Sequence, residues 1–149
     1  MLKAEDIMTR DPITVSPDTE LVKAARILLE NRINGMPVLD EDGTLVGIIC
    51  QSDLISQQKK ISIPSVFTLF DGFIPLASQK WFEKEIKKIV ATTVGQVMVH
   101  DPVTINIDTG IEQISALMVD RNFHTLPVMG MGQLVGIVGK EDILKSILR

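Results

Sequence analysis

One stretch of this chain is written twice, and the repeat limits the folds that the chain can adopt. Residues 45–53 read LVGIICQSD and residues 134–142 read LVGIVGKED. The match extends further, because DIMTRDPITVSPDT at 6–19 corresponds to QVMVHDPVTINIDT at 96–109. Matching residues that recur in one order, ninety positions apart in that segment, indicate two copies of one structural unit.

Each copy predicts the same order of elements, β-α-β-β-α. A short strand follows an Asp-Pro pair, then a helix with apolar residues every three or four positions, two buried strands joined by a glycine turn, and a last helix. Asp18 or Thr19, and Asp108 or Thr109, are expected to cap the first helix of each copy. One copy is too small to bury its own sheet well. The two copies are therefore expected to pack together about a pseudo-twofold axis.

The repeated unit resembles a cystathionine-β-synthase (CBS) domain, and the pair resembles a CBS-pair regulatory module. The resemblance rests on IMTRDPITV, on MPVLDEDGTLVGIICQSDLI and on their second copies. It implies an α+β fold of tandem β-α-β-β-α repeats, with residues 1–58 and 93–149 as the two repeats of one compact module. It also implies a regulatory role, since members of this family bind adenosine compounds and paired modules associate into homodimers.

Residues 59–92 separate the two copies and have no counterpart in the repeat. Five of the six aromatic residues lie there: Phe67, Phe70, Phe73, Trp81 and Phe82. Disordered linkers are poor in aromatic residues, and the spacing in KWFEKEIKKIVA favours a helix. We therefore expect an ordered, partly helical insert that packs within the chain or at a dimer contact. Docking of another protein is the alternative.

By resemblance, each copy supplies an aspartate, Asp53 or Asp142, that accepts hydrogen bonds from two ribose hydroxyls of a ligand. The alternative for an Asp at a helix start is an N-cap, a role that Ser52 would equally fill in the first copy. Similar proteins usually carry Ser or Thr three residues before this Asp, with the hydroxyl toward the phosphate. Here the positions hold Cys50, a weak donor, and Gly139, which offers only its N–H at a helix start.

The resemblance also implies an apolar slot for adenine in each site, built from both copies. The slot beside Asp142 would take Met8, Ile13, Ile33, Asn34, Ile137 and Gly139. The slot beside Asp53 would take Ile48, Cys50, Met98, Val103, Phe123 and His124. Each apolar residue in these sets has an ordinary core role as its alternative.

His124 stands where some family members carry a histidine that contacts phosphate, and an ordinary surface or core histidine is the alternative. Because His124 belongs to the same copy as Asp142, and because Gly139 and Lys140 leave an open, mildly basic helix start, the Asp142 site is the first expectation. AMP, ADP or ATP would use His124 and the helix start for phosphate. S-adenosylmethionine has no phosphate and would explain why both Ser/Thr positions have changed.

No catalytic or metal-binding constellation appears in the sequence, which has two histidines, one cysteine and no tyrosine. A net charge of −4 argues against nucleic acid as a partner. The single cysteine, the charged N-terminus and the lack of a long apolar run predict a cytoplasmic protein without a membrane span. The leading hypothesis is a non-enzymatic sensor that signals to an unidentified effector protein. The alternative is a ligand-free dimerisation or docking module.

Overall fold

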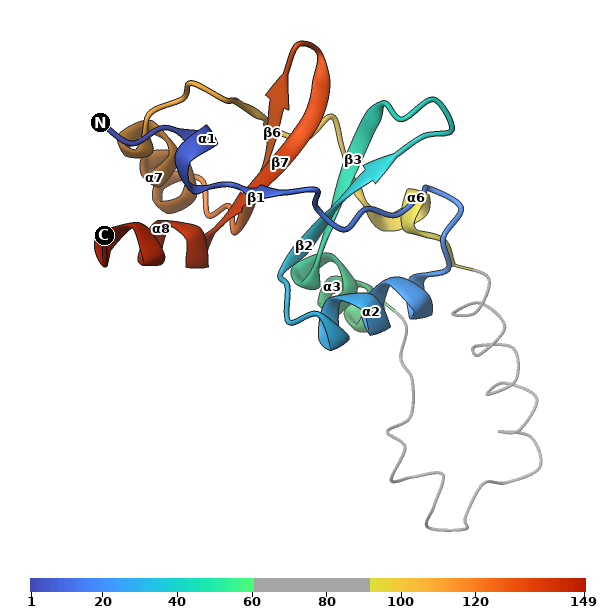
Figure 1. The fold of residues 1–149 in the computed structure, drawn as a ribbon. Coiled ribbons are helices and arrows are strands. Elements are labelled where there is room, and N and C mark those ends of the chain that lie inside the picture. The colour runs from blue at the N-terminus through green and yellow to red at the C-terminus, as the bar shows by residue number, and fades with distance from the viewer. Residues whose placement is uncertain (61–91) are drawn as a thin grey trace, which may run out of the picture.

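A computed structural model of the chain describes residues 1–60 and 92–149, with residues 58–60 described only as helical backbone. Most of the insert predicted for 59–92 lies outside the described residues. In chain order the elements are α1 (Ala4–Ile7), β1 (Thr9–Arg10), α2 (Leu21–Glu30), β2 (Gly35–Leu39), β3 (Leu45–Cys50), α3 (Gln51–Lys60), α6 (Val94–Val97), β4 (Val99–His100), β5 (Ile105–Asn106), α7 (Ile111–Asp120), β6 (Thr125–Gly130), β7 (Gln133–Gly139) and α8 (Lys140–Ile147) (Figure 1).

The strands form two small sheets, one centred on each repeat. The first has the order β2-β3-β4 and the second has the order β1-β7-β6-β5. In the second repeat β5, α7, β6, β7 and α8 follow one another as predicted. In the first repeat the opening strand is reduced to a single parallel bridge between Val15 and Val38. The tandem α+β arrangement predicted from the repeat is confirmed.

Each repeat contributes a short strand near its own start to the sheet of the other repeat. β1 runs antiparallel to β7, with Thr9 opposite Ile137, and β4 runs antiparallel to β3, with Val99 opposite Ile48. Figure 1 shows β1 crossing from the first repeat to lie along β7. Because the two pairings join equivalent positions reciprocally, they relate the repeats by an approximate twofold axis.

Glycines in β3 and β7 allow these exchanged strands to come close. A Cβ atom on Gly47 would lie 2.8 Å from the carbonyl oxygen of Val99, and a Cβ atom on Gly136 would lie 2.8 Å from that of Thr9. Both separations are too short for a carbon atom beside a backbone oxygen, so a side chain would push the exchanged strand away. The close approach explains the glycine that recurs inside LVGII and LVGIV.

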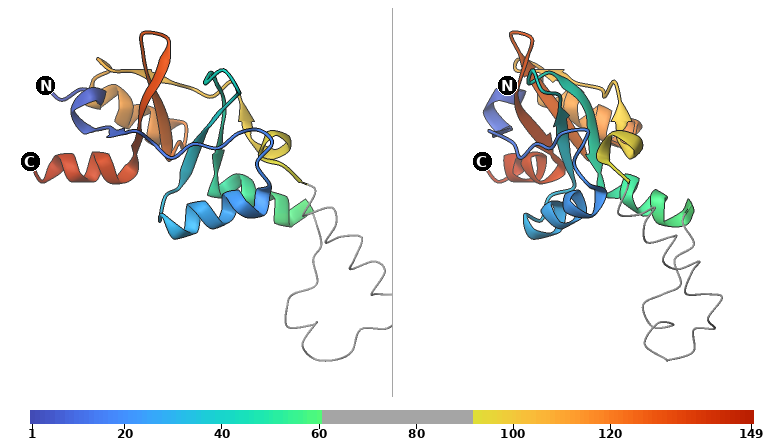
Figure 2. Two further views of the ribbon diagram at one scale, coloured as in Figure 1. Left: turned by 45° about the vertical axis from the view of Figure 1, so that its right-hand side comes forward. Right: turned by 90° about the vertical axis from the view of Figure 1, so that its right-hand side faces the viewer.

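Two apolar cores lie between the sheets and their helices, and neither is complete without the other repeat. The first core includes Val94 and Met98 from the segment that opens the second repeat. The second core includes Ala4 and Ile7 from the N-terminal segment. Figure 2 shows α2 and α3 beside the first sheet, while the N- and C-terminal segments lie at the same end of the molecule. Each repeat therefore contributes apolar residues to the core of the other.

The first long helix of each repeat does not use the predicted caps. The N-cap positions of α2 and α7 are Glu20 and Gly110, and neither has a side-chain cap hydrogen bond. The hydroxyls of Thr19 and Thr109 accept hydrogen bonds from backbone N–H groups three residues earlier, at 3.1 and 2.9 Å. The cap prediction was therefore wrong, because these hydroxyls close the turn before the helix.

Candidate functional site

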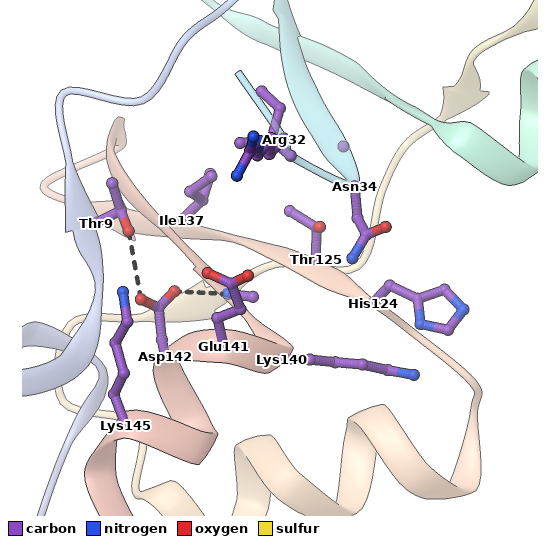
Figure 3. A pocket seen from close by; sticks show the side chains of 13 residues that line it. Thr9, Arg32, Asn34, His124, Thr125, Ile137, Lys140, Glu141, Asp142 and Lys145 are labelled. Carbon is purple, nitrogen blue, oxygen red and sulfur yellow. Dashed lines mark hydrogen bonds between the residues drawn. The ribbon is translucent and has the colours of Figure 1, made fainter. Parts of the chain in front are cut away.

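Asp142 lies in the first turn of α8 and holds the start of that helix. Its Oδ2 accepts a hydrogen bond from the N–H of Gly139, the N-cap residue, at 2.8 Å. Its Oδ1 accepts a hydrogen bond of 3.3 Å from the hydroxyl of Thr9, which arrives on the exchanged strand β1 (Figure 3). Asp142 is thus the third residue of the helix and not its N-cap, which corrects the capping alternative.

Asp53 has the equivalent position at the start of α3. Its Oδ2 accepts a hydrogen bond from the N–H of Cys50 at 2.8 Å. Burial raises the pKa of Asp53 above its ordinary value, and the hydrogen bond from Cys50 partly opposes that shift. In both copies one carboxylate oxygen secures the helix start; the other oxygen of Asp142 accepts the hydrogen bond from Thr9, and that of Asp53 keeps its capacity to accept.

A hollow of about 110 Å³ lies beside Asp142, between the two repeats. It is lined by Thr9, Arg32, Ile33, Asn34, Gly35, His124, Thr125, Ile137, Gly139, Lys140, Glu141, Asp142 and Lys145 (Figure 3). Six residues named in the sequence-based hypothesis line this hollow: Ile33, Asn34, His124, Ile137, Gly139 and Asp142. Residues 32–35 come from the first repeat and most of the others from the second, so the hollow exists only when the repeats are packed together.

Two residues predicted for the same slot do not line this hollow. Met8 packs, half-buried, against the second core, and its Sδ lies 2.8 Å from where a Cβ atom of Gly136 would be. The side chain of Ile13 is 40% exposed. A contact between either residue and a ligand stays a prediction.

The lining also contains residues that the sequence did not single out. Thr9 reaches the hollow because β1 is exchanged between the repeats, and no local sequence pattern signals that exchange. Arg32 has a φ of 54° and its counterpart Asn122 has a φ of 56°, so both end their helices in the left-handed region. Thr125 lies opposite Gly139 on neighbouring strands, a pairing that depends on a register shift after Val128 and that counting from the turn would miss.

The hollow has two chemically different sides. Three cationic side chains line it, Arg32, Lys140 and Lys145, against the two carboxylates Glu141 and Asp142. This local excess of positive charge contrasts with the net charge of −4 for the chain. In Figure 3, Thr9, Asp142 and Lys145 lie on one side, and His124 and Lys140 lie on the other. One side offers a carboxylate acceptor and the other offers groups that attract an anion.

The residues predicted for the slot beside Asp53 are distributed differently. Ile48 and Met98 are buried, with exposures of 6% and 8%. Val103 and Phe123 pack against the second core. The guanidinium group of Arg121 lies 5.3 Å from the centre of the Phe123 ring. His124 lines the hollow beside Asp142, and a ligand slot at Asp53 stays a prediction.

The two copies differ most clearly in a cross-strand pair beside each aspartate. Gly35 faces Cys50 in the first repeat, and Thr125 faces Gly139 in the second. A Cβ atom on Gly35 would lie 2.9 Å from the Sγ atom of Cys50, so the thiol already fills that space. Burial, with the nearby charge of Asp53, raises the pKa of Cys50 to about 12. A protonated thiol therefore occupies the first position, and the second is open at Gly139.

Residues 1–60 and 92–149 contain neither a metal cluster nor a membrane-spanning helix. No group of three or more His, Cys, Asp and Glu side chains in that part of the chain is arranged to hold a metal ion. No helix there combines the length and the apolar character needed to cross a bilayer.

Comparison with known proteins agrees with the geometry. Protein MJ1426 of Methanocaldococcus jannaschii is 32% identical over 97% of this chain and 90% of its own length. The crystal structure of CBSX2 from Arabidopsis thaliana in complex with AMP superposes with a TM-score of 0.74, at 25% identity, over 99% of this chain and 97% of the other. The CBS domain pair of protein MJ0100, in complex with 5-methylthioadenosine and S-adenosyl-L-methionine, superposes with a TM-score of 0.72, at 25% identity, over 99% and 96%.

Some relatives are longer than this chain. It spans 62% and 58% of two chloroplast CBS domain-containing proteins of Arabidopsis thaliana. It spans 22% of an L-aspartate semialdehyde sulfurtransferase of Methanocaldococcus jannaschii, so a similar unit also occurs inside an enzyme. The family model described as "CBS domain" matches residues 4–60 and again residues 94–149. The chain therefore belongs to the CBS domain family, with two copies of the domain.

Proposed function

We propose that this chain is a regulatory module that binds an adenosine-containing molecule in the hollow beside Asp142. The observation that carries the proposal is the pairing, in one hollow between the repeats, of a half-buried carboxylate with a cationic side. The carboxylate of Asp142 is suited to accept hydrogen bonds from two ribose hydroxyls. Arg32, His124 and Lys140 are suited to a phosphate group. Complexes of similar structures with AMP and with S-adenosylmethionine support this ligand class.

AMP is the preferred ligand, ahead of ADP, ATP and S-adenosylmethionine. The positive charge of the lining favours an anion over a sulfonium, which is itself cationic. The hollow of about 110 Å³ is also smaller than the roughly 300–1,000 Å³ of usual ligand sites, so side chains must move when a ligand enters. AMP has the fewest phosphate groups of the three nucleotides and requires the smallest movement.

A titration panel tests this proposal directly. AMP, ADP, ATP, S-adenosylmethionine and inorganic phosphate would each be titrated into the protein by calorimetry, with melting temperature as a second measurement. A ligand that binds only the folded state raises the melting temperature. We expect the largest rise with AMP and little with phosphate alone. If no adenosine compound binds at millimolar concentration, the sensor function is wrong.

The module is proposed to work by binding and not by catalysis. Its ligand would contact both repeats, since the lining comes from residues 32–35 and from the second repeat. Binding would therefore restrain how the repeats sit against each other, and an unidentified effector protein would respond to that change. We place this activity in the cytoplasm, where the single cysteine would stay reduced.

A homodimer is part of the same proposal. Large apolar side chains are exposed on the helices of both repeats: Leu29 (74%), Ile55 (69%), Val119 (80%), Leu144 (62%) and Ile147 (73%). Exposed apolar side chains of this kind favour association where they join into one contiguous surface. The same residues favour the second candidate function, a dimerisation module that binds no ligand. Light scattering at micromolar concentration would distinguish a dimer from a monomer, and V119E with L144E should shift a dimer toward monomer.

A further inference from the structure

One hydroxyl group in the hollow beside Asp142 lacks a partner in the protein. Thr125 is 6% exposed, which makes it a buried polar residue. Its hydroxyl takes part in none of the hydrogen bonds found among the described residues. No side-chain nitrogen or oxygen atom in residues 1–57 and 92–149 is both fully buried and unpaired. The Thr125 hydroxyl must therefore remain reachable, and the hollow that Thr125 lines provides the access.

The Thr125 hydroxyl lies next to two glycines, Gly35 across the repeat interface and Gly139 on the neighbouring strand; a Cβ atom on Gly35 would lie 3.3 Å from Thr125 Oγ1. Thr125 and Gly139 are cross-strand partners, so their side-chain positions lie on the same face of the sheet. A Cβ atom at position 139 would have only ordinary contacts, 3.8 Å from the backbone oxygen of His124 and 3.9 Å from Asp142 Oδ2. Such a Cβ atom would have no atom of Thr125 within 4 Å, so position 139 is open space beside the threonine. Figure 3 shows the Thr125 side chain between Ile137 and Asn34, facing the space that the other side chains surround.

The surroundings indicate which ligand group this hydroxyl would meet. Arg32, His124 and Lys140 line the same hollow, so an anionic oxygen is the group most stabilised there. A hydroxyl with no internal acceptor gains a strong hydrogen bond by donating to such an oxygen. Resting on the function proposed above, we propose that Thr125 Oγ1 donates a hydrogen bond to a phosphate oxygen of the bound nucleotide. Thr125 is then a specificity-determining residue that favours a phosphorylated over an unphosphorylated adenosine.

The equivalent pair in the first repeat cannot act in this way. Gly35 has no side chain. Its cross-strand partner is Cys50, whose thiol lies next to Gly35 and is a much weaker hydrogen-bond donor than a hydroxyl. The Thr125–Gly139 pair therefore makes the two helix starts chemically different. The asymmetry assigns the phosphate to the cleft beside Asp142.

The test compares four proteins, each titrated by calorimetry with AMP and with adenosine: wild type, T125V, T125S and the double variant T125V/G139S. Valine keeps the shape of threonine and replaces the hydroxyl with a methyl group. We expect T125V to bind AMP about tenfold more weakly, as the loss of a hydrogen bond to a charged group requires. Adenosine binding should change less than about twofold, and T125S should resemble the wild type.

The double variant moves the hydroxyl across the strand pair into the open space at position 139. It should recover part of the AMP affinity that T125V loses. Equal AMP affinity in T125V and wild type would overturn the inference. An equal loss of affinity for AMP and for adenosine would also overturn it, because it would show that the Thr125 hydroxyl has only a structural role. If the wild type binds no adenosine compound, the proposed function itself fails. Melting temperatures without ligand confirm that all four proteins fold.

Discussion

The starts of α3 and α8 are built alike and differ in what surrounds them. Each holds an aspartate in its third position, and each aspartate accepts a hydrogen bond of 2.8 Å from the N–H three residues earlier. Beside Asp142 lies a hollow with a free hydroxyl, an open glycine position and three cationic side chains. Beside Asp53 a half-buried thiol fills the space next to Gly35.

Comparing the two helix starts separates two roles of the aspartate, which are holding the helix start and binding a ligand. Holding the helix start is common to both aspartates, so this role explains why the carboxylate occurs in both copies. Binding a ligand additionally depends on neighbours, and the neighbours differ at one cross-strand pair and in the hollow itself. A repeated motif thus supports a repeated fold without supporting two equal sites.

The largest expected effect separates the two aspartates. D142A and D53A remove the same hydrogen bond to the helix start, so each serves as the structural control for the other. D142A also removes the acceptor for the ribose hydroxyls, and we expect AMP affinity to fall by about tenfold to hundredfold. D53A should stay near wild type. Calorimetric titration measures both, and equal losses would show that the two sites do not differ as proposed.

The next effect concerns the stability of the first repeat. G35T brings a side chain to within 2.9 Å of the Cys50 Sγ atom, and overpacking of this kind costs about 1–3 kcal/mol of unfolding free energy. C50G should restore most of that loss in the double variant G35T/C50G, which then carries the Thr–Gly pair of the second repeat. Urea unfolding measures the difference. G139S is the control, because position 139 has room for a side chain and G139S should leave the unfolding free energy close to that of wild type.

A smaller effect is expected from the cationic side of the hollow. R32N removes the charge and keeps a residue that tolerates the left-handed φ of 54° found there. Arg32 is exposed, so we expect AMP affinity to fall by about two- to fivefold, more at low salt than at high salt. The matched control is R26Q, a change of charge on the exposed surface of α2, away from the hollow. An equal effect of both variants would mean that only the net charge matters.

The smallest effect is a pH dependence of stability in the first repeat. Burial raises the pKa of Asp53 above its ordinary value of 3.8. A carboxyl group with a raised folded-state pKa stabilises the fold while it is protonated, and this contribution is lost as the pH rises through the folded-state pKa. The stability of wild type minus that of D53N should therefore fall as the pH rises from about 4 toward neutral. Unfolding of both proteins from pH 4 to 7 tests this, and a difference that rises with pH would contradict it.

Much of the fold and part of the site were predictable from the printed residues. The repeat predicted two equivalent units and their order of elements, because buried strands and amphipathic helices leave local patterns. It also pointed to Asp142, His124 and Gly139, which the structure brings to one hollow. Arg32 and Thr9 were not predicted, since their positions depend on contacts between repeats that no local pattern encodes.

The pair beside each aspartate shows where sequence reasoning stops. Counting back evenly from the turn after β6 would place Thr125 opposite Val138 and would point it to the wrong face. The register shifts by one residue after Val128, so Thr125 meets Gly139, and the same shift after Val38 brings Gly35 to Cys50. A one-residue bulge reverses which side chains share a face of the sheet.

The sequence by itself therefore determined that there are two units, which elements they contain and which residues recur in both. The tertiary structure alone decided which strand each unit exchanges, which face Thr125 shares with Gly139 and which aspartate has a hollow beside it. The physical reason is the distance along the chain over which each interaction acts. Helix and strand patterns are set by neighbours within a few residues. In contrast, β1 and β7, or Arg32 and Asp142, meet only when the two repeats pack.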